Sequence, residues 1–364
     1  MVPITSTVPG LLTAAFLTLA AVTSASTITV KPHQLIQAAI DAAQPGDTIV
    51  VKAGVYAEQL TIKTDCITLT GQKGTILVPP TTPVPPAQQN LCFNTTGFDN
   101  IAGICVHGTD VELAQFPGSE HQKVISVGRR VKDVTITGFE INGFSGENIA
   151  LYGAEDALVT KNKIVDGQVY GVLAAGCINS DVSNNKILST GLTPFGFRFI
   201  GVCSDNESGA KVWTNDVDNY GIAICIQTNG ANIQHNHITN SCLGAFVDPG
   251  VDGAIVRHNN IGPSNPACAT AFGASSGIFV AGINTEVQFN TVVGQTIGAA
   301  ATSENLGVGI NVRDIPGDPR IAAGNQIVRN NVSNCQLDLA LNSTGAGNVF
   351  KKNKCQTPAS LCTS

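Results

Sequence analysis

Three aspartates in the middle of the chain have the chemistry that acid–base catalysis needs: Asp205, Asp218 and Asp248. A glycoside hydrolase uses two carboxyl groups, one that donates a proton and one that acts as base or nucleophile. A polysaccharide lyase needs a base for the C5 proton of a uronate and a positive group that stabilises the enediolate. Arg313 is the first basic candidate for a lyase, and two more are Arg198 and Lys211. In a lyase the aspartates could also bind Ca²⁺ through their oxygen atoms.

Further side chains are candidates for substrate contacts: Tyr152, Arg198, Tyr220, Gln227 and Glu304. The alternative is structural, because aspartate is common in turns and each carboxylate could serve only the fold. We expect no metal centre, since no group of Cys and His residues has zinc spacing. His235 and His258 precede the same repeated Asn, so we expect them to stack on the surface about 4.8 Å apart.

The element that must position these residues is a repeat that starts near residue 134. Its unit is an apolar residue, two variable residues, Asn, one variable residue and a second apolar residue. Copies include VTKNKI (159–164), VSNNKI (182–187), IQHNHI (233–238) and VRHNNI (256–261). Most copies are 21 to 23 residues apart, and such a period is typical of a solenoid.

A second pattern follows in most coils, a Gly and then alternating apolar residues, as in GVLAA (171–175) and GIAICI (221–226). Alternation predicts a short strand with one buried face. Coils stacked at about 4.8 Å pair each strand with its copies above and below. Because Asn tolerates the left-handed conformation of a turn, we expect the repeated amides to form a ladder. Aligned on the Gly, these residues lie just beyond successive strand ends: Tyr152, Asp205, Gln227, Asp248 and Arg313.

Residues 35–77 form a different block, with an amphipathic helix expected over 35–43 and then a PGD turn and short strands. A helix at this point covers the open end of the coil stack. Together with the Asn repeats, the block resembles the right-handed β-helix proteins of the pectin-lyase-like superfamily, over residues 30–356, and the chain is similar to a fungal secreted member. The resemblance implies an all-β, right-handed single-stranded parallel β-helix of about eleven coils with an N-terminal capping helix. It also implies a carbohydrate-active enzyme or a non-catalytic relative.

The motifs of two activities in that superfamily are not matched. TNDVD (214–218) only partly resembles the first element of the polygalacturonase set, and RDIPGDPR (313–320) has the wrong Arg spacing for pectate lyase. Three coils are lengthened between the Asn and the Gly strand, at 190–199, 262–276 and 294–306. They leave from the same turn, so we expect them to form one wall of an elongated groove that takes a chain-like ligand.

The first residues have the pattern of a secretory signal peptide. An apolar stretch covers 11–22, and Thr23 and Ala25 are the small residues that precede a cleavage site. We therefore expect a signal peptide (1–25) and one β-helix domain (26–364). This domain divides into an N-terminal cap (31–47), coils (48–356) and a disulfide-stapled tail (355–364).

Eleven cysteines agree with an oxidising compartment. Cys92 with Cys105, and Cys355 with Cys362, are near enough in sequence to close small loops. In successive coils, neighbours could pair among Cys177, Cys203, Cys225 and Cys242. Glycosylation is expected at four sequons: Asn94, Asn206, Asn331 and Asn342.

The net charge of −6 without a basic run argues against a nucleic-acid partner. We expect an extracellular monomer that has no membrane contact after signal cleavage and whose partner is a carbohydrate polymer. The leading hypothesis is a polysaccharide lyase or glycoside hydrolase. The alternatives are a non-catalytic carbohydrate- or wall-binding protein and a lyase or isomerase that acts on a small molecule.

Overall fold

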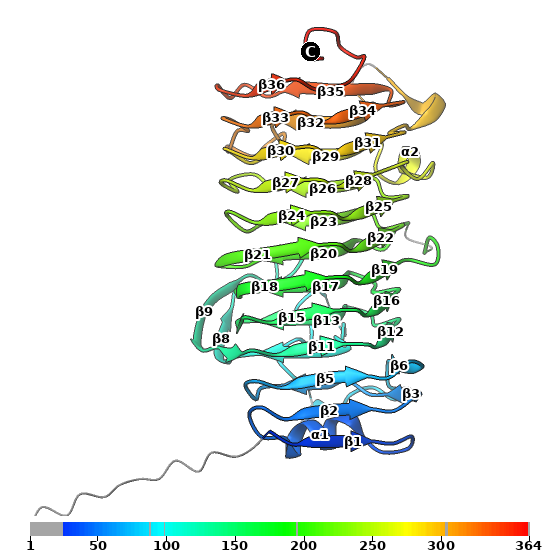
Figure 1. The fold of residues 1–364 in the computed structure, drawn as a ribbon, viewed down its shortest axis with the longest axis vertical. Helices are drawn as coiled ribbons and strands as arrows, with labels where there is room; N and C mark the ends of the chain where they lie inside the picture. The colour runs from blue at the N-terminus through cyan, green and yellow to red at the C-terminus, as the bar shows by residue number, and fades with distance from the viewer. Residues whose placement is uncertain (1–24, 87–88, 98, 194–195, 303–304, 363–364) are drawn as a thin grey trace, which may run out of the picture.

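The computed structural model describes residues 25–362 except 87–88, 98, 194–195 and 303–304. Within these residues the strands form a 14-stranded and two 10-stranded parallel sheets, here A, B and C. The coils contribute strands to sheets A, B and C in turn, with two short strands in sheet A from each of two coils (β10 with β11, and β14 with β15). The coils stack into a rod (Figure 1). The predicted signal peptide lies outside the described residues except for Ala25.

The bounds of the elements follow the repeat. Sheet A contains β1 (Thr27–Val30), β2 (Thr48–Val51), β5 (Thr68–Gly71), β10 (Val131–Lys132), β11 (Thr135–Thr137), β14 (Ala154–Glu155), β15 (Leu158–Thr160), β18 (Ile178–Ser183), β21 (Ser208–Trp213), β24 (Asn232–Gln234), β27 (Ile255–Arg257), β30 (Glu286–Gln288), β33 (Gln326–Val328) and β36 (Val349–Lys351). Sheet B contains β3 (Gly54–Ala57), β6 (Thr75–Val78), β12 (Glu140–Asn142), β16 (Lys163–Val165), β19 (Lys186–Leu188), β22 (Asp216–Asp218), β25 (His237–Thr239), β28 (Asn260–Ile261), β31 (Thr291–Val293) and β34 (Asn331–Ser333).

Sheet C carries the longer strands: β4 (Leu60–Ile62), β7 (Ile104–His107), β13 (Glu147–Tyr152), β17 (Tyr170–Ala175), β20 (Ile200–Asp205), β23 (Ile222–Ile226), β26 (Leu243–Val247), β29 (Ser275–Val280), β32 (Gly307–Arg313) and β35 (Leu337–Asn342). An antiparallel hairpin, β8 (Thr109–Leu113) and β9 (Val124–Arg129), leaves the stack after β7. Helical elements among the described residues include α1 (Ile36–Ala42), α2 (Cys268–Ala271) and the 3-10 turn η2 (Gly298–Ala300).

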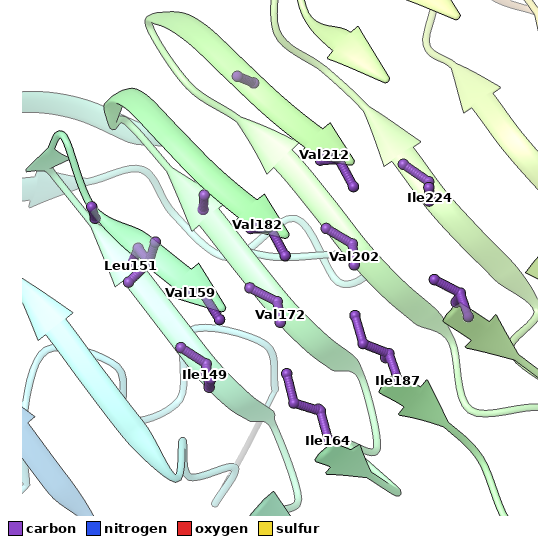
Figure 2. Packing of buried hydrophobic residues seen from close by; sticks show 14 of the residues in the cluster. Ile149, Leu151, Val159, Ile164, Val172, Val182, Ile187, Val202, Val212 and Ile224 are labelled. Carbon is purple, nitrogen blue, oxygen red and sulfur yellow. The ribbon is translucent and has the colours of Figure 1, made fainter. Parts of the chain in front are cut away.

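The core is a set of apolar columns that run the length of the rod. Ile149, Val172 and Val202 stack on successive strands of sheet C, where the register pairs them directly (Figure 2). Their side chains are fully buried. β-Branched residues dominate because they pack well against their copies on a pleated surface.

The predicted Asn ladder lies at the turn from sheet A to sheet B. Asn215 Nδ2 donates to Asn236 Oδ1 at 3.1 Å, and Asn236 Nδ2 donates to Asn259 Oδ1 at 3.0 Å. Each amide also donates to a strand carbonyl, as Asn236 does to Val212 O at 2.9 Å. The preceding residue takes the left-handed conformation, with φ of 56° at His235. The ladder therefore satisfies buried backbone groups that the turn would otherwise leave without partners.

The capping helix forms close to its predicted bounds, as α1, and buries Ile36, Ala39 and Ile40 against the first coils. The Glu58 carboxylate accepts hydrogen bonds from the backbone N–H groups of Ile36 and Gln37 at 2.9 and 3.0 Å. A carboxylate at this end of a helix satisfies free donors and complements the helix dipole.

Two predicted disulfides are confirmed, Cys92–Cys105 and Cys355–Cys362. Cys242, one of the four cysteines among which neighbours could pair, instead forms its disulfide with Cys268 in the lengthened segment 262–276. The cysteines described without a disulfide are Cys66, Cys177, Cys203, Cys225 and Cys335. In the part of the chain that is described, no helix has the length and apolarity of a membrane span.

The ladder makes a quantitative prediction for Asn236→Ala. The change removes the acceptor of the Asn215 amide and the donor to Val212 O, and each buried group left unpaired costs about 1–3 kcal/mol. We expect the free energy of unfolding to fall by about 3 kcal/mol, measured by denaturant titration. Asn260→Ala, at an exposed position of the next coil, is the matched control and should change it by less than about 0.5 kcal/mol. Equal effects of the two substitutions would contradict a stabilising ladder.

Candidate functional site

Outward-facing residues at the ends of sheet C strands form a column of polar side chains. Asp205 ends β20, Gln227 follows β23 and Asp248 follows β26. The register pairs Ser204 with Ile226, and Ile226 with Val247, so these three residues occupy successive levels of one column. The predicted alignment of Tyr152 with Asp205 is confirmed, because both pair with Ala175.

A segment outside the repeat supplies the rest of this site. Between β7 and β10 the chain makes the β8–β9 hairpin and its connection, residues 108–130, beside the green coils in Figure 1. Leu113 and Val124 of the hairpin pack on the outer apolar face of sheet C. The connection between them brings Glu120, His121 and Lys123 to the column.

Asp205 is held by two of these side chains. His121 is fully buried, and its Nε2 lies 2.9 Å from Asp205 Oδ2. His121 Nδ1 lies 3.1 Å from the buried Tyr170 hydroxyl, which fixes the direction of the ring. Lys123 Nζ lies 3.2 Å from the same carboxylate oxygen. Two donors therefore converge on Asp205 Oδ2.

Gln227 connects this pair to the second carboxyl group. Lys123 Nζ donates to Gln227 Oε1 at 2.5 Å. Gln227 Nε2 donates to Asp248 Oδ2 at 2.6 Å and to Glu120 Oε2 at 3.1 Å. Because Asp205 and Asp248 are two coils apart, we place their Cα atoms about 9–10 Å from each other. The side chain of Gln227 spans the level between them.

The two carboxyl groups have opposite pKa shifts. Burial of Asp205 disfavours its charge, but the hydrogen bond and charge of His121 and Lys123 outweigh this, so the pKa of Asp205 is lowered. Desolvation raises the pKa of Asp248 to about 7. The hydrogen bond from Gln227 lowers this pKa, and the negative charge of Glu120 raises it further. Asp248 Oδ1 is buried and has no hydrogen-bond partner among the described residues. Below about pH 7 the site therefore holds an ionised carboxyl group at Asp205 and a protonated one at Asp248.

These groups line a hollow of about 360 Å³. Arg320 reaches the hollow from the loop after β32, where Asp318 accepts hydrogen bonds from its guanidinium. Phe246 and Phe279 form an edge-to-face pair with centroids 5.3 Å apart, and Phe246 precedes Asp248 by two residues on the same face. The hollow thus combines acid–base groups with cations and an adjacent apolar surface.

A larger hollow of about 810 Å³ lies at the N-terminal end, between α1 and the Pro-rich segment near residues 80–90. Its acidic residues include Asp41 and Glu58. The Glu58 carboxylate is used to cap α1, and the Asp41 carboxylate accepts a hydrogen bond from Gln37 of the same helix at 2.7 Å. We therefore assign the chemistry to the smaller hollow.

The structure separates Asp218 from the other two aspartates. Asp218 ends β22 in sheet B, and the whole of β23 lies between it and Gln227. Its Oδ1 accepts hydrogen bonds from Thr239 and Asn240 at 2.7 and 2.8 Å. The two ends of a strand that crosses sheet C cannot share one small site.

The other predicted residues lie apart from the hollow. Arg198 pairs with Asp166 at 3.0 Å, and Lys211 lies on sheet A. Arg313 ends β32, beside Asn342 in the register. Tyr152 and Tyr220 are fully buried, and Glu304 lies outside the described residues.

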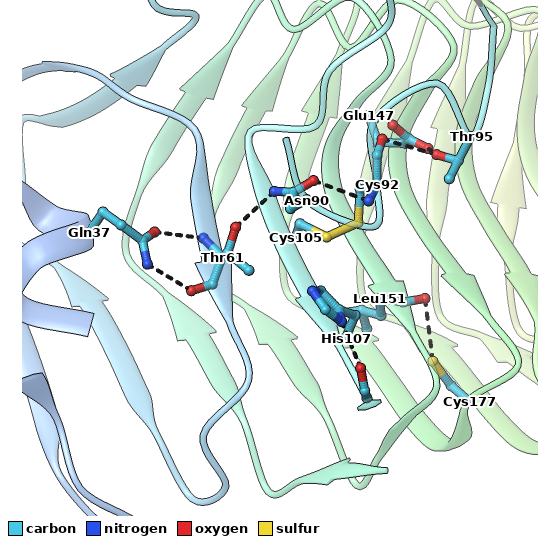
Figure 3. Close-up of a disulfide and its surroundings, with 11 residues drawn as sticks. Gln37, Thr61, Asn90, Cys92, Thr95, Cys105, His107, Glu147, Leu151 and Cys177 are labelled. Atoms are coloured by element: carbon cyan, nitrogen blue, oxygen red, sulfur yellow. Dashed lines mark hydrogen bonds between the residues drawn. A yellow bond between two sulfur atoms is a disulfide. The ribbon is translucent and has the colours of Figure 1, made fainter. Parts of the chain in front are cut away.

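Tyr152 belongs to a covered part of sheet C. Here the Cys92–Cys105 disulfide ties a loop to β7, and Thr95 Oγ1 of this loop donates to Glu147 Oε1 of the neighbouring β13 at 3.0 Å (Figure 3). Glu147 is fully buried, and desolvation raises its pKa to about 8. This cover closes the lower coils, so the open part of the column begins at Asp205.

Among the described residues, no group of three or more His, Cys, Asp or Glu side chains could hold a metal ion. Ca²⁺ does not fit at Asp205, because His121 and Lys123 already direct positive or donor groups at its carboxylate. The predicted stacking of His235 on His258 is confirmed, with ring centroids 5.1 Å apart and nearly parallel planes.

The four sequons differ in accessibility. Asn331 and Asn342 are exposed, and Asn94 is partly buried. Asn206 is buried, and its Nδ2 donates to Ser180 Oγ at 2.6 Å.

The three lengthened segments follow β19, β28 and β31, so all leave from the turn between sheets B and C, as predicted. Phe197, Cys268 and Ile297, one from each, belong to a single apolar cluster. They lie at the starts of the sheet C strands, whereas the column of Asp205 and Asp248 lies at their ends. The outer face of sheet C is therefore bordered by insertions on both sides.

No family model and no curated protein matches this sequence. Solved structures do match. A family 28 exopolygalacturonase from Yersinia enterocolitica aligns with 93% of this chain and 77% of its own at 14% identity and a TM-score of 0.55. This chain has the right-handed parallel β-helix fold.

Two further matches support this fold. A DFA-IIIase from Arthrobacter chlorophenolicus A6 without its lid aligns with 91% of the β-helix chain and 98% of its own, at 14% identity and a TM-score of 0.54. The Dettilon tailspike protein aligns with 90% of this chain and 58% of its own, at 15% identity and a TM-score of 0.50. At such identities these likenesses describe the fold alone.

Sequence reasoning missed Glu120, His121, Lys123 and Arg320. The available signal was an interruption, because more than 20 residues separate β7 from β10 without the alternating pattern of a coil. A segment of this kind must pack somewhere on the rod, but its own residues do not indicate which level it reaches.

The raised pKa of Asp248 predicts a dependence of stability on pH. The folded-state pKa of about 7 lies above the ordinary value of 3.8, so folding becomes less favourable as pH rises from about 4 to 7. In Asp248→Asn this loss is absent, and we expect the variant to gain about 1–3 kcal/mol relative to the wild type between pH 4 and pH 8. Denaturant titrations at both pH values measure it. Parallel pH curves for the two proteins would rule the shift out, and Asp41→Asn at the exposed face of α1 is the control.

Proposed function

We propose that this protein is a secreted glycoside hydrolase in which Asp248 is the general acid and Asp205 is the general base. The observation that carries the proposal is the opposed pKa shift of two carboxyl groups that line one open hollow. Environments that separate the pKa values of two carboxyl groups are what acid–base hydrolysis requires. The fold, which exopolygalacturonase and DFA-IIIase structures also have, supports a carbohydrate substrate.

In this mechanism Asp248 delivers its proton to the glycosidic oxygen as the bond breaks. Asp205, kept ionised by His121 and Lys123, removes a proton from the attacking water. Their two-coil separation favours the inverting reaction, since inverting enzymes keep their carboxyl groups about 6.5–9.5 Å apart to admit water. Gln227 orients Asp248, and the Phe246–Phe279 pair offers an apolar surface to a sugar ring.

The lyase hypothesis has less support. Its predicted basic residues, Arg198, Lys211 and Arg313, do not line the hollow. Lys123 and Arg320 do, but the charge of Asp205 contributes to raising the pKa of Lys123 despite its burial. A lysine that stays protonated is a poor base and serves better as a binding group for an anionic substrate.

Secretion is part of the proposal. It is supported by the sequence pattern of residues 1–25 and by three disulfides, which persist in oxidising compartments. We further propose that the protein acts as a monomer on an extracellular polymer. A non-catalytic carbohydrate-binding role is the alternative if hydrolysis is not found.

The first test is a hydrolysis screen of the purified protein on neutral and acidic polysaccharides and oligosaccharides, read by reducing ends and, for a lyase, by absorbance near 235 nm. We expect reducing ends without absorbance. On the best substrate, Asp205→Asn and Asp248→Asn should each lower kcat by about 10²–10⁴-fold. Asp218→Asn is the matched control and should retain wild-type activity. Loss of activity in Asp218→Asn with full activity in the other two would refute the assignment, and absorbance at 235 nm would replace hydrolysis with elimination.

The same assignment predicts an acidic pH optimum. The rate falls as pH drops through the lowered pKa of Asp205, which must be ionised, and as pH rises through about 7, where Asp248 loses its proton. We expect kcat/KM to fall on the alkaline side with a midpoint near pH 7. His121→Asn should move the acidic midpoint to higher pH, since the charged form of Asp205 loses a partner. A profile that continues to rise above pH 8 would exclude Asp248 as the acid.

A further inference from the structure

Two cysteines without a disulfide face each other on neighbouring strands beside the site. Cys203 of β20 and Cys225 of β23 are direct partners in the register. Their Sγ atoms are 2.7 Å apart, which is closer than two unbonded sulfur atoms pack. Both side chains are buried in the apolar cluster on the outer face of sheet C. Among the described cysteines, they alone have another unbridged sulfur as partner.

The remaining unbridged cysteines have different surroundings. The thiol of Cys177 donates to the carbonyls of Leu151 and Ala175 at 3.4 Å, and that of Cys335 donates to the carbonyl of Ser333 at 3.4 Å. Cys66 is exposed and lies 3.9 Å from an Asp133 oxygen. None of these arrangements brings two sulfur atoms together, so the Cys203–Cys225 contact is specific to one level of the rod.

We propose that Cys203 and Cys225 form a fourth disulfide in the secreted protein. In-register parallel strands hold the Cα atoms of Cys203 and Cys225 about 4.8 Å apart. Disulfides span Cα–Cα distances of about 4.4–6.8 Å. Both side chains leave the same face of the sheet, so the bond forms by a small rotation of the two side chains. The cross-link joins coils 22 residues apart.

The reaction is a thiol–disulfide exchange with an oxidised dithiol or with glutathione disulfide. The Cys203 thiolate attacks one sulfur of the disulfide donor and releases a thiolate. The Cys225 thiolate then attacks Cys203 Sγ in the mixed disulfide and releases the second thiolate. Two cysteines are oxidised, one disulfide donor is reduced to two thiols, and the two protons lost by the cysteines pass to the released thiolates.

The order of folding follows from burial. In the folded protein the pair lies beneath the segment 108–130, whose Leu113 and Val124 pack on the same cluster. A disulfide donor reaches the sulfur atoms only before this segment docks, so the bond forms during folding. Once covered, the disulfide is shielded from reductants.

The cross-link lies directly beside the acid–base column. Asp205, the last residue of β20, and Gln227, directly after β23, follow Cys203 and Cys225 by two residues and point to the same face. A covalent bond here fixes the spacing of the two levels that Lys123 and Gln227 connect. The proposal rests on the sulfur geometry and stands whether or not the site hydrolyses a glycoside.

The test is differential alkylation of the secreted protein. The protein is denatured without reductant, labelled with iodoacetamide, then reduced, labelled with N-ethylmaleimide and digested for mass spectrometry. We expect iodoacetamide on three cysteines (Cys66, Cys177 and Cys335) and, in an unreduced digest, a peptide pair linked through Cys203 and Cys225. Iodoacetamide on both Cys203 and Cys225 would overturn the proposal.

Single cysteine variants change the number of free thiols in opposite directions, depending on whether the Cys203–Cys225 disulfide forms. If the disulfide forms, Cys203→Ala frees Cys225, and the thiol count in denaturant rises from three to four. If it does not form, the same variant lowers the count from five to four. Cys225→Ala repeats the measurement independently, and the control Cys66→Ser must lower the count by one in either case. Because thiols are counted in denaturant, the result does not depend on how well each variant folds.

Discussion

Each coil of this molecule is completed by the coils above and below it, and this in-register stacking is the constraint on which everything else depends. Apart from the β8–β9 hairpin, the described strands pair with strands of the coils above and below, so the backbone groups of an interior strand find partners in the neighbouring repeats. At the turn between sheets A and B, where the strand pairing ends, the ladder of Asn215, Asn236 and Asn259 continues the pairing with amide groups. A shift of one residue in any coil would break the ladder and turn its apolar residues outward.

Stacking also explains how distant residues form a site. Residues one repeat apart occupy the same place at successive levels, so Asp205, Gln227 and Asp248 become neighbours although more than 20 residues separate each from the next. The residue type at a position of this column does not by itself decide the protonation state of the side chain. Asp205 and Asp248 are the same residue type, but His121 and Lys123 keep Asp205 charged, while desolvation raises the pKa of Asp248 to about 7.

The segments that break the repeat distinguish this rod from a bare scaffold. The lengthened segments after β19, β28 and β31 border one side of sheet C, and residues 108–130 border and partly cover the other. The cover also buries Cys203 and Cys225 and gives the acid–base column its donors. Regular stacking therefore supplies rigidity, and irregular segments supply the chemistry, as is common for loops on rigid scaffolds.

The sequence by itself determined the architecture, because a repeated pattern has only one register in which all copies agree. The Asn ladder, the capping helix α1 and the level shared by Asp205, Gln227 and Asp248 all follow from local periodicity. It also suggested Asp218, which shares their residue type and neighbourhood in sequence, but its strand ends at the other edge of sheet C. Only the tertiary structure decided that His121 and Lys123 meet Asp205, since 84 residues separate the His121–Asp205 pair and residues 108–130 carry no repeat that indicates their level. The opposed pKa shifts followed from that contact and from burial, which are properties of the packed molecule rather than of either aspartate.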